Sequence, residues 1–78
     1  MTTLLNTTIE DAAVDALKKK NQKLLDLIST AIRRDKQTPK QIDYFIHRRF
    51  GFKKGHPIRD LCYLAACSIE RKAKAVQS

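Results

Sequence analysis

The chain has 78 residues, of which 42% are hydrophobic, so it can form one small domain with a core and is too apolar for general disorder. Sixteen Lys and Arg residues against eight Asp and Glu give a formal net charge of +8, which favours an anionic partner. It shows neither a secretory leader nor an apolar run long enough to span a bilayer. We therefore expect a soluble, cytoplasmic protein that does not bind a membrane.

The charges are distributed unevenly. Residues 1–17 carry three acids and no base, whereas bases outnumber acids from residue 18 to the end of the chain. An acidic lead followed by a basic body indicates an anion-binding surface rather than uniform solubilisation.

The two cysteines, Cys62 and Cys67, are five positions apart. On a helix this spacing places them about 140° apart, so they can neither pair with each other nor share a metal ion. We interpret Cys62 as a small core residue of a reduced chain. We expect no cofactor and no metal site.

A first helix is predicted over about residues 8–34, because apolar residues recur at helical spacing from Ile9 to Ile32. Thr7 followed by Glu10 fits a capping box at its start. Residues 1–7 and 75–78 are expected to fray. The polar run 18–23 interrupts the apolar stripe, although the step from Leu17 to Leu24 keeps its phase.

The length of this first helix leaves two alternatives. A continuous helix would be about 40 Å long, whereas a domain of this size is about 30 Å across. Either the helix breaks near Asn21, or its overhang pairs with a second copy of the chain. The preserved phase favours the continuous helix and a homodimer.

Two further helices have clear boundaries. Thr38 as N-cap, Pro39 at the first position and Gln41 at the third predict a helix over 39–50 that Gly51 ends. Its apolar stripe comprises Ile42, Phe45, Ile46 and Phe50. Pro57, with His56 as a weak N-cap, starts a helix over 57–74. Since four of the five aromatic residues fall between positions 44 and 52, we expect the core to be centred there. The predicted fold is an all-α, three-helix single domain spanning residues 1–78.

The connection from residue 47 to residue 59 is the leading candidate site, with five Lys or Arg, two His and two Phe. Cationic side chains bind successive phosphates, and an aromatic ring can stack on an unpaired base. We predict a nucleic-acid-binding protein, a regulatory or accessory factor, in which these residues contact the ligand: Arg48, Arg49, Phe52, Lys53, Lys54, His56 and Arg59. A secondary patch comprises Lys18, Lys19 and Lys20. In the alternative interpretation the loop is merely solvated and Phe52 turns into the core.

Three other functions have weaker support from the sequence. A helix–turn–helix uses a shorter turn than the six residues between the second and third helices, so the geometry departs from that module. The choice between DNA and RNA stays open, because exposed aromatic residues favour single strands whereas the long first helix favours a duplex. His47 and His56 could form an acid–base pair in a small ribonuclease, but nothing in the sequence sets their geometry, so we predict no enzyme and no catalytic residue. The competing function is a helical protein-interaction module, an adaptor or inhibitor that docks on an acidic partner protein through Tyr63 and Leu64.

Overall fold

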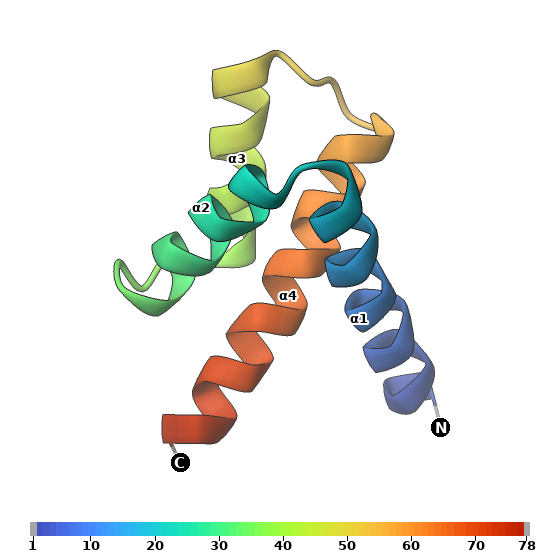
Figure 1. The fold of residues 1–78 in the computed structure, drawn as a ribbon, viewed down its shortest axis with the longest axis vertical. Helices are drawn as coiled ribbons and strands as arrows, with labels where there is room; N and C mark the ends of the chain where they lie inside the picture. Colours follow the sequence, from blue (N-terminus) through green and yellow to red (C-terminus); the bar gives the residue numbers. More distant parts are fainter. Residues whose placement is uncertain (1, 78) are drawn as a thin grey trace.

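The computed structural model describes residues 2–77, with side chains described for residues 9–75. Its elements in chain order are α1 (Thr2–Lys20), α2 (Gln22–Arg33), α3 (Pro39–Phe50) and α4 (Pro57–Gln77) (Figure 1). The described residues contain helices and connections but no strand, which confirms the all-α prediction. The backbone is already helical at Thr2, so the predicted start near residue 8 is wrong. The Thr7 side chain of the expected capping box lies outside the described side chains.

The predicted 8–34 helix is two helices, with the break at Asn21. This residue leaves helical geometry at φ −158° and ψ 86°, and its side-chain oxygen accepts a hydrogen bond from the Leu24 amide at 3.1 Å. An asparagine at this position caps α2, because its short side chain satisfies an amide that the first turn leaves without a partner. The continuous helix is therefore wrong, and the break near Asn21 is confirmed.

Leu17 and Leu24 keep the phase of one helix in the sequence although the helix breaks between them. Both are buried, but they reach the core from different helices that meet at the turn. The chain folds back on itself with a radius of gyration of 11.9 Å, close to that expected for this length. No overhanging helix remains, so the argument for a homodimer that rested on the overhang is removed.

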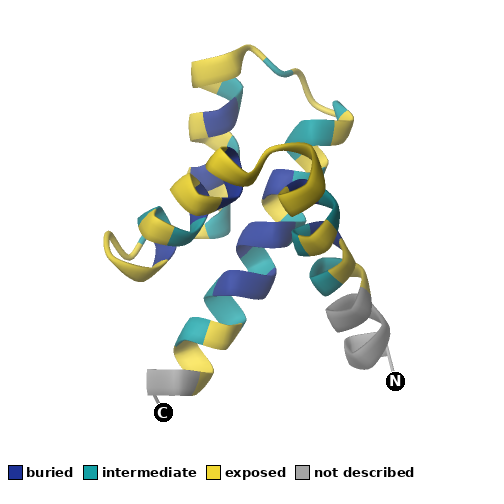
Figure 2. Ribbon diagram, viewed as in Figure 1, coloured by how far each residue is buried: buried dark blue, intermediate teal, exposed yellow. Residues whose placement is uncertain are grey.

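α4 is the helix against which α1, α2 and α3 all pack. Its middle carries small side chains that are fully buried (Figure 2), among them Ala65, Ala66 and Ser68. Small residues let neighbouring helices come close, and α1 does so: the Ser68 hydroxyl donates a hydrogen bond to Asp11 of α1 at 2.7 Å. Arg71 adds ion pairs to Glu10 and Asp11.

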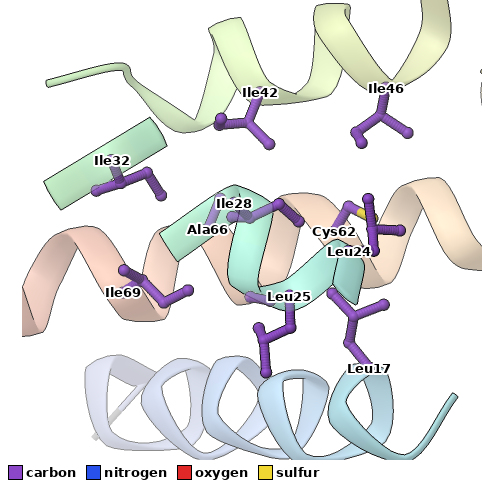
Figure 3. Close-up of a cluster of buried hydrophobic side chains, with 11 residues drawn as sticks. Leu17, Leu24, Leu25, Ile28, Ile32, Ile42, Ile46, Cys62, Ala66 and Ile69 are labelled. Carbon is purple, nitrogen blue, oxygen red and sulfur yellow. The ribbon is translucent and has the colours of Figure 1, made fainter. Parts of the chain in front are cut away.

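The core is aliphatic rather than aromatic. It is built mainly from Leu and Ile side chains of all four helices, with Cys62 and small residues of α4 (Figure 3). Ile42 and Ile46 of α3 are buried, but Phe45 and Phe50 are 41% and 45% exposed. The expectation of a core centred on residues 44–52 is therefore wrong, because only Ile42 and Ile46 of the α3 stripe face the core.

Several local predictions are confirmed. The Thr38 capping box is complete, with both hydrogen bonds to Gln41 formed, and Gly51 ends α3 in the left-handed conformation at φ 73°. Cys62 is fully buried, and burial raises the pKa of its thiol to about 11. None of the helices in residues 2–77 combines the length and the apolar character needed to cross a bilayer.

Candidate nucleic-acid interface

The connection from Gly51 to His56 is held firmly at both ends. The Phe52 carbonyl accepts a hydrogen bond from Nδ1 of His47 at 2.7 Å and another from Arg59 at 3.2 Å. The guanidinium of Arg59 also forms a two-pronged ion pair with Asp43 of α3, with nitrogen–oxygen distances of 2.8 and 2.9 Å. A fork of this geometry is among the strong hydrogen-bonded pairs in proteins. The loop is thus clamped onto α3 and α4.

The aromatic side chains of the connection stack on one another. The Phe52 ring lies between Phe50, with centroids 5.6 Å apart, and His56, with centroids 4.1 Å apart. Phe52 is half-buried and packs against the core, so its ring turns inward, as the alternative interpretation expected of this one side chain. Phe50, which the sequence placed in the core, is the more exposed ring of the stack.

Three of the predicted contact residues make packing contacts or hydrogen bonds within the protein itself. Phe52 packs as described, and Arg59 is engaged by Asp43 and the Phe52 carbonyl. The Nδ1 atom of His56 accepts a hydrogen bond from the Ile58 amide at 3.1 Å, as expected of an N-cap. These residues shape the loop and present little surface to a ligand.

The remaining seven predicted residues are exposed, and an eighth base joins them. We call these eight residues the basic end: Lys18, Lys19, Lys20, Lys23, Arg48, Arg49, Lys53 and Lys54. The turn between α1 and α2, the last turn of α3 and the loop after it all lie in the upper half of Figure 1. Lys23 and Arg49 line the same hollow of about 320 Å³, so the two basic segments adjoin directly.

No acid of the described residues lies within ion-pair distance of the basic end, although the pKa of the Asp43 carboxyl, which hydrogen bonds from Arg59 lower, is lowered further by nearby Lys54. Among the described residues, none of the eight forms an ion pair. Most bases elsewhere are paired: Arg34 with Asp35, Arg59 with Asp43, Arg71 with Glu10 and Asp11, Lys72 with Asp11, and Lys74 with Glu70. Unneutralised positive charge is therefore concentrated at this end.

The negative C-terminal ends of α1 and α3 do not neutralise the positive charge of the basic end. Lys18, Lys19 and Lys20 lie in the last turn of α1, and Arg48 and Arg49 in the last turn of α3. A helix C-terminus carries about half a negative charge, which one cation more than offsets. Two or three cations at each end leave a large positive surplus exposed to solvent.

Two arginines of α3 lie beside exposed rings. The Arg48 guanidinium is 5.9 Å from the centroid of the Tyr44 ring, and that of Arg49 is 5.7 Å from Phe50. Tyr44 is 62% exposed. Each of these two arginines therefore has an exposed aromatic ring beside it. Sequence reasoning missed Phe50 because its place in the apolar stripe of α3 suggested burial, whereas at the end of that helix its side chain is 45% exposed.

The surface first considered for a protein partner is less open than expected. Tyr63 is 37% exposed and Leu64 is half-buried, and both line a shallow hollow with Asp43, Lys54 and Asp60. In the described part of the chain no three His, Cys, Asp or Glu side chains come together to hold a metal ion.

The Asp43–Arg59 fork predicts a pH dependence of stability. Hydrogen bonds from Arg59 lower the pKa of the Asp43 carboxyl below its unfolded value of about 3.9. The stabilisation is therefore complete above that pH and is lost as pH falls through the lower, folded pKa. Urea unfolding should show Asp43→Asn less stable than the parent at about pH 6, with the difference shrinking towards about pH 2.5. A difference independent of pH would mean that the ionised carboxylate is not what stabilises this contact.

Comparisons of the chain with protein-family models, with curated proteins and with solved structures found no match.

Proposed function

We propose that the protein binds nucleic acid through its basic end, as a regulatory or accessory factor. The observation that carries the proposal is the juxtaposition of two unpaired basic segments, residues 18–23 and 48–54, at one end of a small domain. Eight cations that form no ion pair among the described residues match a ligand with closely spaced negative charges, and neutralised phosphates release counterions on binding. Within the described part of the chain, five of the eight acids form ion pairs with other bases, chiefly between α1 and α4 and beneath the loop.

Single-stranded nucleic acid fits this surface better than a duplex. Exposed Phe50 and Tyr44 rings next to Arg49 and Arg48 offer flat surfaces on which unpaired bases stack. A duplex keeps its bases stacked inside and would leave these rings without a role. The loop clamp preorganises the lysines Lys53 and Lys54, which lowers the entropic cost of binding.

Fluorescence anisotropy with labelled oligonucleotides of about 16 nucleotides tests the proposal. In about 50 mM salt we expect a single strand to bind more tightly than its duplex. A plot of log affinity against log salt should have a slope between about −3 and −6, since each phosphate contact contributes about 0.7 and eight bases set the upper limit. No binding of either form in low salt, or an affinity that salt does not change, would overturn the proposal.

A further inference from the structure

An apolar groove runs between α2 and α3. One hollow of this groove has a volume of about 400 Å³ and is lined by the buried Ile28 and Ile42, with Leu27, Ala31 and Phe45 around them. Leu27 and Phe45 also line the neighbouring hollow of about 320 Å³ towards the start of α2. The two hollows together follow the length of α2, which is about 18 Å for a helix of its size.

The groove exists because α2 and α3 both pack on α4 and scarcely touch each other. Their facing flanks are consequently left open. Four of the six large hydrophobic side chains that are exposed on the described surface lie on these two helices: Leu27, Tyr44, Phe45 and Phe50. Single exposed apolar residues are ordinary on proteins, but a cluster around a hollow with charged residues at its edge is typical of an interaction site.

The edge of the groove is positively charged. Lys23 and Arg49 form no ion pair among the described residues. Bases outnumber acids at the described edge, because Arg34 is balanced by Asp35 and Asp26 alone keeps an uncompensated negative charge. Asp35 pairs with Arg34 at 3.1 Å, and Asp26 accepts a hydrogen bond from Gln22 at 2.8 Å. An occupant that is apolar on one side and acidic on the other would match both the lining and the edge.

Other occupants fit less well. In a second copy of the chain the acidic helix is α1, whose Glu10 and Asp11 are already paired with Arg71. Residues 2–77 contain no strand, so there is no sheet edge to which an extended peptide could add. A nucleic acid would find the floor of the groove aliphatic and without a cation to meet a phosphate.

From this complementarity we propose that the groove between α2 and α3 binds an acidic amphipathic helix of a partner protein. Such a helix presents apolar side chains at positions i, i+3 or i+4 and i+7, which span about 10 Å along its axis. Two or three of them enter the hollows on either side of Leu27 and Phe45. Acidic residues on the flanks of the helix meet Lys23 and Arg49.

Selection from a displayed library of peptides of about 16 residues, a little over four helical turns, tests the proposal. The library is enriched on the parent protein alone, and the survivors are then measured against the double variant Leu27→Gln/Phe45→Gln. The surviving peptides should be net acidic with apolar residues at helical spacing, and should bind the double variant at least tenfold more weakly. Ile9→Gln is the matched control, because Ile9 is exposed to the same degree as Leu27 but lies on α1.

Far-UV circular dichroism establishes that each variant is folded, and the single variant Leu27→Gln supplies a milder change if the double variant loses stability. The proposal would be overturned by any of three results. The selected peptides could be basic, they could lack helical periodicity, or they could bind Ile9→Gln as weakly as they bind the double variant. Light scattering that shows a parent dimer and a monomeric double variant would assign the groove to a second copy instead. Loss of oligonucleotide binding in the double variant, which keeps every base, would assign the groove to nucleic acid.

Discussion

Glutamine substitutions at four bases of the basic end are expected to weaken binding of a single-stranded oligonucleotide by two to three orders of magnitude in about 100 mM salt. The four are Arg48, Arg49, Lys53 and Lys54. Each phosphate contact to a single strand contributes about 0.7 to the salt slope, so four contacts account for about 2.8, which at about 0.1 M salt corresponds to roughly 2.8 decades of affinity. Glutamine keeps most of the length of each side chain, so packing of the aliphatic stems is largely retained.

The matched control removes four bases from the opposite end of α2 and the start of α3: Arg33→Gln, Arg34→Gln, Lys36→Asn and Lys40→Gln. It lowers the net charge by the same amount, and asparagine suits position 36, where φ is 59°. If the affinity follows total charge alone, the two variants will bind equally. A loss of less than tenfold in the first variant, or an equal loss in the control, would contradict the assignment of the basic end.

The largest effect on stability is expected at Ile28. This side chain is fully buried between α2, α3 and α4 (Figure 3), and truncation of such a residue to alanine costs about 2–5 kcal/mol, as lost burial plus a cavity. A domain of this length has a free energy of unfolding of about 4–12 kcal/mol in all. Ile28→Ala should therefore leave the domain marginally folded, with a much lower urea midpoint and an unchanged m-value.

The adjacent residue provides the control for this prediction. Leu27 is 46% exposed, so Leu27→Ala removes much less buried surface and should cost under about 1 kcal/mol. Urea unfolding monitored by circular dichroism compares the two variants directly. An equal loss of unfolding free energy in Ile28→Ala and Leu27→Ala would mean that α2 packs on α4 with a different face.

Elements with local signals could be predicted from the sequence. The boundaries of α3 and the start of α4 follow from Thr38, Pro39, Gly51 and Pro57, each of which acts through its own backbone geometry or cap. The break at Asn21 was ambiguous, because an asparagine is tolerated within a helix and Leu17 and Leu24 keep helical phase. Whether α2 folds back depends on its packing against α4. These two helices are far apart in the sequence, so no local pattern predicts that contact.

The candidate site was likewise predictable from the sequence only in part. The bases of residues 47–59 are evident from composition, but their availability depends on partners distant in sequence. Arg59 appeared to be a phosphate ligand until its fork with Asp43, sixteen positions earlier, was seen in the structure. Phe52 is drawn inward by the rings beside it and by the core. The proximity of residues 18–23 to residues 48–54 follows only from the turn at Asn21.

The most direct test of the central claim is a ¹H–¹⁵N NMR titration of the protein with a single-stranded oligonucleotide. If the two basic segments form one binding surface, amide shifts should change together for residues 18–23 and 48–54 with a single affinity, while the α1–α4 contact around Ser68 and Arg71 stays unperturbed. Shift changes confined to one segment, or centred on the middle of α4, would contradict the claim that nucleic acid binds at the basic end.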